Sequence, residues 1–220
     1  MNMNKLLKGI LASLLLAFGV NASADPIGGP NSGCGTCFDS TITLQFEVVS
    51  ATEYLIHLFV DTTTFVGNGN TVLNDWWISQ VSVKPAEPIT NASNLVSSPS
   101  NAFTFVLGGL NNSGCQANAN NGFECATTNS ITAVGTGSNG GTYEWIFDTF
   151  VANANDWLIA AGGASVKINY NGPNNPNGVL TSENISLQPF IPLLVPEPGT
   201  LALLGIGTLG LALARRRRKS

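Results

Sequence analysis

Positively charged side chains are almost absent from the middle of this 220-residue chain. Of nine lysines and arginines, only Lys84 and Lys167 lie between residues 25 and 194. That range holds twelve of the thirteen carboxylates, so its formal net charge is −10. A surface with so few cations cannot neutralise a phosphate backbone, which argues against nucleic acid as a partner.

Histidine is also scarce, and this weakens the case for a zinc or redox site. The chain has one histidine, His57, and one Cys-x-x-Cys motif, Cys34 to Cys37. A zinc site of four cysteines would have two such motifs, and His57 sits inside a strand-like run. A thioredoxin-like motif places its first thiol at a helix start after a strand, whereas this motif lies in the loop-like segment PIGGPNSGCGTCFDS. The sequence therefore predicts neither chemistry.

No catalytic constellation is evident. There is no GxSxG motif, and no serine has a base that the sequence reveals. A glycoside hydrolase needs two carboxylates across a cleft, and no pair stands out by spacing. The candidates by residue type are Glu53, Asp61, Glu144, Asp148 and Asp156. We therefore expect a protein that is not an enzyme.

Two of the candidate side chains are expected to be inert. Glu144 alternates with Tyr143 and Trp145, as on a solvated strand face. His57 lies four residues from Glu53, about 13 Å along an extended strand, which is too far for direct contact.

Metal and sugar sites stay open. The acidic body offers oxygen ligands for calcium but contains no Asp-x-Asp-x-Asp loop, so no metal or cofactor is assigned. Trp76, Trp77, Trp145 and Trp157 could line a sugar-stacking surface. Adjacent tryptophans in a strand point to opposite faces, so at most one of the first two can lie fully in the same core.

Eight segments of the body alternate apolar and polar residues, the pattern of half-buried strands. They are residues 41–49, 54–60, 76–83, 103–107, 130–134, 143–151, 165–170 and 179–187. Clusters of glycine, asparagine, proline and serine separate them, and no segment sustains a helical period. We therefore predict one all-β domain over residues 25–194, a sandwich or a jelly roll.

The amino-terminal segment has the layout of a secretory signal. Lys5 and Lys8 precede an apolar run over residues 9–20, and small residues follow at 22–24. The run is too short to span a bilayer. We predict a signal peptide over residues 1–24, cleaved after Ala24.

Export places the four cysteines, Cys34, Cys37, Cys115 and Cys125, in an oxidising compartment, where an even count indicates two disulfides. Three pairings are possible. Cys34–Cys37 and Cys115–Cys125 are favoured because each pair is close in sequence.

The carboxyl-terminal segment looks like a membrane anchor. Sixteen residues, 199–214, form an apolar run that as a helix reaches about 24 Å, short of a hydrocarbon core of about 30 Å. Bilayer thinning and long arginine stems can absorb this mismatch. The cations of residues 215–219 would stay in the cytoplasm, which places the body outside.

Two prolines, Pro196 and Pro198, would stop the helix from continuing outward, leaving an extended stretch accessible to a processing enzyme. The order VPEP, apolar run and RRRRK resembles the PEP-CTERM sorting signal of Gram-negative bacteria, which a membrane-embedded exosortase recognises. The resemblance covers residues 195–220 and implies processing near the triplet. The sorting residues that it implies are Val195, Pro196, Glu197, Pro198, Gly199, Arg215, Arg216, Arg217 and Arg218.

We therefore expect a non-enzymatic protein that is exported and held in the inner membrane by its tail. Exosortase would then process it for display on the cell surface or for release. The resemblance implies an exopolysaccharide matrix as its setting. The alternative is a secreted carbohydrate-binding or carbohydrate-active module. The sequence leaves the ligand of the body and its oligomeric state open.

Overall fold

The computed structural model describes most of the predicted body and neither terminus. The described residues are 26–29, 34–67, 71–72, 75–86, 88–111, 113–117, 122–130, 134–153 and 164–189. All of them belong to the unit Met1–Phe190, and the second unit, Ile191–Ser220, lies outside them. The predicted signal peptide with its cleavage site at Ala24 and the predicted tail helix are likewise outside. Within the described residues, no helix is long and apolar enough to cross a membrane.

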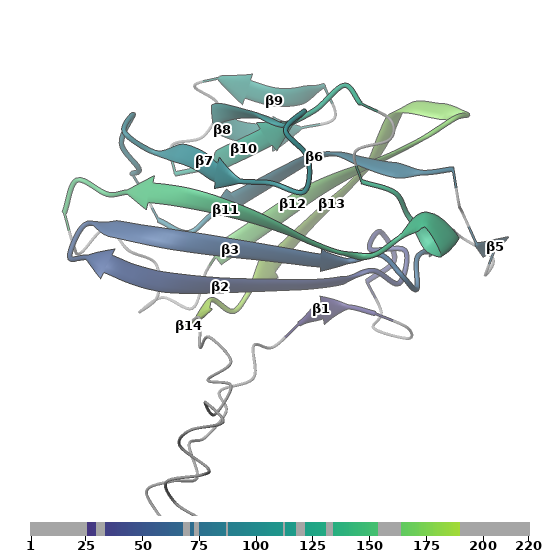
Figure 1. Ribbon diagram of the computed structural model, residues 1–220, viewed down its shortest axis with the longest axis horizontal. Helices are drawn as coiled ribbons and strands as arrows, with labels where there is room; N and C mark the ends of the chain where they lie inside the picture. The colour runs from purple at the N-terminus through teal and green to yellow at the C-terminus, as the bar shows by residue number, and fades with distance from the viewer. Residues whose placement is uncertain are drawn as a thin grey trace, which may run out of the picture. The chain divides into compact units, whose positions relative to one another are not determined.

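The described chain forms two large sheets (Figure 1). The first has the order β1-β2-β3-β11-β7. Strand β2 pairs with β1 and also, in parallel, with β14. Its strands are β1 (Ile27–Gly28), β2 (Thr41–Ser50), β3 (Glu53–Asp61), β7 (Asn94–Ser97), β11 (Thr142–Phe150) and β14 (Gln188–Pro189).

The second sheet has the order β13-β12-β6-β10-β8-β9 and is antiparallel throughout. Its strands are β6 (Trp77–Lys84), β8 (Thr104–Asn111), β9 (Gly114–Ala117), β10 (Glu124–Thr127), β12 (Ala164–Gly172) and β13 (Asn175–Ile185). A short ribbon of β4 (Val66–Gly67) and β5 (Thr71–Val72) and one 3-10 turn, η1 (Gly137–Asn139), complete the described elements.

Alternation of side chains sets which face of each strand is buried. In the hairpin of β2 and β3, Ile42 pairs with Val60 and Leu44 with Leu58, and all four side chains are buried. A shift of one residue in this register would expose the whole apolar set, so burial itself fixes the pairing.

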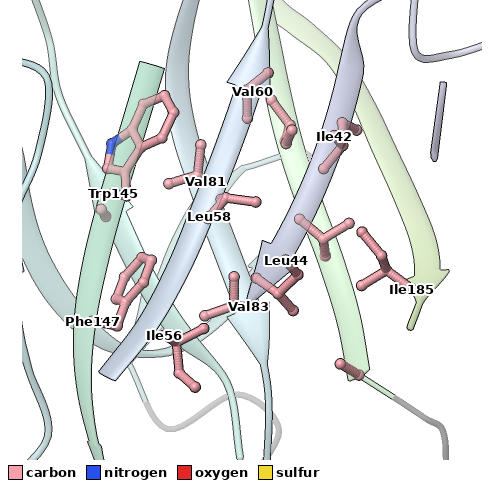
Figure 2. Packing of buried hydrophobic residues seen from close by; sticks show 14 of the residues in the cluster. Ile42, Leu44, Ile56, Leu58, Val60, Val81, Val83, Trp145, Phe147 and Ile185 are labelled. Atoms are coloured by element: carbon pink, nitrogen blue, oxygen red, sulfur yellow. The ribbon is translucent and has the colours of Figure 1, made fainter. Parts of the chain in front are cut away.

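The hydrophobic core lies between the two sheets, and both contribute to it (Figure 2). The first sheet supplies Trp145 and Phe147 from β11, and the second supplies Val81 and Val83 from β6. Phe103 packs edge-on against Trp145, with the ring centroids 5.4 Å apart. The prediction of an all-β body is therefore confirmed, and its architecture is a β-sandwich.

The structure differs from the sequence prediction at the short strands. No strand was expected at β7, β9 or β10, each only four residues long. Conversely, Ser130 and Val134, the ends of one expected strand, lie outside the strands, and residues 131–133 are not described. Strands as short as these form because neighbouring strands pair with them, and their own sequences are too short to show an alternating pattern.

A glutamic acid, Glu124, lies inside the core. It points inward from β10 between Val83 of β6 and Leu107 of β8, and it has no exposed surface. The Thr149 hydroxyl of the opposite sheet donates a hydrogen bond of 2.7 Å to Glu124 Oε2. Burial raises the pKa of Glu124 to about 8, although the hydroxyls of Thr149 and Ser93 act in the opposite direction. The carboxyl group is therefore mainly protonated at neutral pH.

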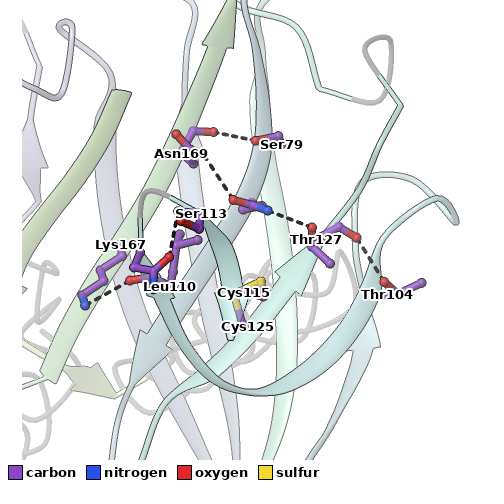
Figure 3. Close-up of a disulfide and its surroundings, with 11 residues drawn as sticks. Ser79, Thr104, Leu110, Ser113, Cys115, Cys125, Thr127, Lys167 and Asn169 are labelled. Carbon is purple, nitrogen blue, oxygen red and sulfur yellow. Dashed lines mark hydrogen bonds between the residues drawn. A yellow bond between two sulfur atoms is a disulfide. The ribbon is translucent and has the colours of Figure 1, made fainter. Parts of the chain in front are cut away.

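The disulfide Cys115–Cys125 ties β9 to β10 at one end of the second sheet (Figure 3). The other disulfide, Cys34–Cys37, closes a turn before β2. These are the two pairings favoured from the sequence, and no cysteine of the chain is free.

The substitution Glu124→Gln is expected to make the protein more stable at pH 8 and to leave its stability unchanged below pH 4.5. Between these values the unfolded carboxyl group ionises while the folded one keeps its proton, so wild-type stability falls as the pH rises. The difference at pH 8 should be on the order of a few kcal/mol. Denaturant unfolding from pH 4 to pH 9 measures it. Glu47→Gln, at an exposed position of β2, is the matched control and should keep the wild-type slope.

Removing the two disulfides should have unequal effects. The loop between Cys115 and Cys125 spans ten residues and that between Cys34 and Cys37 three. The chain-entropy model therefore predicts that the double alanine variant of Cys115 and Cys125 loses about 2–3 kcal/mol of unfolding free energy. The double alanine variant of Cys34 and Cys37 should lose about 1–2 kcal/mol. Denaturant unfolding of both variants tests this, and a larger loss for the Cys34–Cys37 variant would contradict it.

Candidate functional site

A network of polar side chains crosses the outer face of the second sheet (Figure 3). Asn169 of β12 donates through Nδ2 to Gln80 Oε1 of β6 at 3.2 Å. Gln80 Nε2 donates in turn to Thr127 Oγ1 of β10, also at 3.2 Å. Thr104 of β8 donates to the Thr127 carbonyl at 3.3 Å. Four neighbouring strands are thus joined on one face by side chains in fixed orientations.

A β-bulge in β6 places an additional hydroxyl on this face. Asn169 pairs with Gln80 but Tyr170 pairs with Ile78, so Ser79 is the extra residue. Its hydroxyl contacts the Asn171 side chain, donating to Oδ1 at 2.7 Å. The bulge keeps Ile78 in the core and brings Ser79 and Gln80 together on the outer side.

One glycine brings β13 close to the two asparagines. Gly178 has φ +74°, and a Cβ there would stand 2.1 Å from Asn169 Oδ1 and 2.6 Å from Asn171 Oδ1. Any other residue at this position would collide with these acceptors. Asn169 is only 4% exposed, and its Oδ1 atom has no hydrogen-bond partner within the described part of the chain.

The tryptophans occupy different environments. Trp145 is fully buried, and Trp157 lies outside the described residues. Trp76 packs into an aromatic cluster, 5.6 Å from the ring centroid of Phe38, and lies over Gly172, which has no side chain to obstruct it.

Trp77 instead pairs with Asn171 and is half-buried on the outer face of the second sheet. The opposite orientation of Trp76 and Trp77 agrees with the expectation for adjacent residues in a strand.

Charge is divided between the two outer faces. By strand alternation, the outer face of the first sheet carries Glu47, Glu53, Asp61, Glu144 and Asp148. In the strands of the second sheet, the two carboxylates, Glu124 and Glu183, are paired with inward-facing residues. Its outer face carries Lys84 and Lys167, paired with Ser165 and Ser82. The polar network therefore lies on a face without strand carboxylates.

His57 has a partner that the sequence did not reveal. Its Nδ1 atom lies 2.7 Å from Glu144 Oε1 of the neighbouring strand, and the ring stacks on Phe59. The expectation that Glu53 is out of reach is compatible with this, but Glu144, expected to be simply solvated, holds the histidine. The two residues are 87 positions apart, and only the β3–β11 register brings them together.

Among the hydrolase candidates that the structure describes, no pair is evident. Asp61 accepts hydrogen bonds from the backbone and hydroxyl of Thr63 in its own turn. Asp148 accepts from Asn94 at 3.5 Å, and burial raises its pKa. Asp156 lies outside the described residues.

Among the described residues, one group combines three potential metal-ligating side chains, namely Cys34, Cys37 and Glu183. The two sulfur atoms are joined in a disulfide and are therefore not thiolate ligands. Glu183 Oε1 lies 3.4 Å from the Cys34 sulfur, which has no proton to donate in this state. A carboxylate beside a cysteine disfavours its thiolate, which is unlike the electropositive surroundings of redox-active motifs.

The solved structures that are similar to this chain include the two that follow. The collagen binding subdomain ACE19 of Enterococcus faecalis surface protein ACE is 13% identical, with 68% of this chain and 96% of that chain covered and a TM-score of 0.27. The seventh ScaB type I cohesin from Pseudobacteroides cellulosolvens is 11% identical, with 68% and 94% covered and a TM-score of 0.28. Similarity at this level does not indicate a shared function.

No curated protein matches the sequence. Residues 194–218, which include the predicted sorting residues Val195 to Gly199 and Arg215 to Arg218, match the family model of the PEP-CTERM protein-sorting motif. These residues lie outside the described part of the chain, so the match is one of sequence. The chain is therefore a β-sandwich protein that carries a PEP-CTERM sorting signal.

Proposed function

We propose that this protein is an exported, non-enzymatic component of the cell surface or extracellular matrix, delivered there by exosortase. The sorting motif at residues 194–218 carries this proposal, since such signals imply export and membrane-associated sorting by exosortase. The signal peptide over residues 1–24 provides the route out of the cytoplasm. The apolar run over 199–214 holds the chain in the inner membrane until processing.

The disulfides support an extracytoplasmic location for the body. All four cysteines of the chain are paired. Disulfides form and persist in oxidising compartments and are rare in the cytosol. The disulfides and the sorting signal thus both favour a body that lies outside the cytoplasm.

The positions of the acidic side chains support a role without catalysis. Glu144 is engaged by His57, and Asp61 is engaged within its own turn. Among the described residues, the one fully buried carboxyl group is Glu124, and it lies inside the core, where a substrate has no access. Surface display, rather than turnover, is the function that this arrangement favours.

Replacing Pro196, Glu197 and Pro198 together by alanine is expected to block processing. The variant should stay in the membrane fraction as a chain that retains Ser220, whereas the wild type should lose its tail. Intact-mass spectrometry of fractionated cells that contain exosortase measures both. Pro192→Ala, outside the matched residues, is the control and should be processed normally. Wild-type protein recovered from the cytosol with Ser220 in place would contradict the proposal.

A further inference from the structure

We propose that the outer edge of β13 pairs with β13 of a second copy of this chain, so that the two second sheets become one continuous sheet. The two strands run antiparallel about a two-fold axis. This inference does not rest on the sorting proposal, because it depends only on the folded body. It assigns a partner to a strand edge that has no pairing role within the sandwich.

The strand β13 (Asn175–Ile185) is the longest of the described strands, and it lies at one end of the second sheet. One side of its backbone pairs with β12, in a register that is regular from Ala164 to Tyr170. Within the described part of the chain, no strand pairs with the other side and no loop backbone hydrogen-bonds to it. Such an edge presents a row of N–H and C=O groups with which another strand can pair.

The other sheet edges carry features by which proteins prevent the addition of a strand. The edge strands β7 and β9 are each four residues long, and β7 has a bulge where it pairs with β11. The two-residue strands β1 and β14 cover parts of the edge of β2. From Gly178 to Ile185, β13 has no proline, no lysine and no bulge. Among the described strands, it is therefore the long edge that is open to pairing.

The inner side of β13 is already fixed by the loop that the Cys34–Cys37 disulfide closes. The Thr181 hydroxyl donates a hydrogen bond of 2.6 Å to the Thr36 carbonyl. Glu183 Oε1 lies 3.4 Å from the Cys34 sulfur, so this carboxylate is turned toward the loop. The strand is held in place before a partner arrives, and little conformational entropy is therefore lost on pairing.

The distribution of charge favours a second copy as the partner. Because the body has a formal net charge of −10, two copies repel each other least where carboxylates are few. Between Gly178 and Ile185 the only ionisable side chain is Glu183, which faces inward. A cationic partner would instead be drawn to the carboxylates on the outer face of the first sheet. A second copy brings an edge of the same length and neutrality, and an edge that pairs with itself forms a closed dimer.

The test is sedimentation velocity of the full-length protein at increasing concentration, in a detergent matched to the density of the solvent. We expect a monomer–dimer equilibrium. The double variant Ser182→Asp, Asn184→Asp adds two carboxylates at exposed positions of β13. It should raise the dissociation constant about tenfold or more at low salt, because like charges on neighbouring strands repel. The new carboxylate at position 184 can still accept the hydrogen bond from Ser165.

The double variant Asn111→Asp, Ser113→Asp is the matched control. It makes the same two changes at exposed positions next to β9, which lies at the opposite edge of the same sheet. It should dimerise as the wild type does. Hydrogen exchange gives a second readout, since backbone amides between Gly178 and Ile185 should exchange more slowly at concentrations where the wild type is dimeric. Circular dichroism and thermal unfolding of each variant separate loss of the contact from loss of the fold.

Three results would overturn the proposal. A wild type that stays monomeric up to about 0.1 mM would leave the edge of β13 to a different partner. Dimers that the β13 variant does not weaken, or that the control weakens equally, would place the contact elsewhere in the chain, for example in the apolar tail. Open-ended assemblies in place of dimers would contradict pairing about a two-fold axis. None of these outcomes bears on whether the tail is processed, so the sorting proposal is tested separately.

Discussion

The structure depends on the burial of alternate side chains between two sheets. Leu44 and Leu58 from one sheet and Val81 and Val83 from the other are fully buried. Because every second residue of a strand points into this layer, the remaining residues are forced onto two outer faces. The division of charge between those faces, carboxylates on one and lysines with amides on the other, follows from which residues occupy the outward positions.

Local pattern was sufficient to predict the long strands. Burial on one face imposes a period of two residues, and β2, β3, β11 and β12 are long enough to show it. The four-residue strand β10 shows no such period, and it is held in place by β6 on one side and β8 on the other. Its existence depends on contacts that are distant in sequence, which no local pattern contains.

The same distinction applies to the candidate site. The disulfides join cysteines three and ten positions apart, and sequence proximity was enough to favour them. The contact between His57 and Glu144 joins residues 87 positions apart, and that between Asn169 and Gln80 joins residues 89 apart. Such pairs follow from strand order and register. The inward position of Glu124 likewise depends on the pairing of β10 with β6 and β8.

The bulge at Ser79 determines the orientation of the residues that precede it in β6. In a regular strand, Val81 would put Ser79 inside with it, Ile78 outside and Trp77 inside. The single extra residue restores an apolar side chain to the interior and turns the indole to the surface. One extra residue therefore decides both which side chains of this strand enter the core and which ones face outward. An insertion or deletion here would change the core and the surface together.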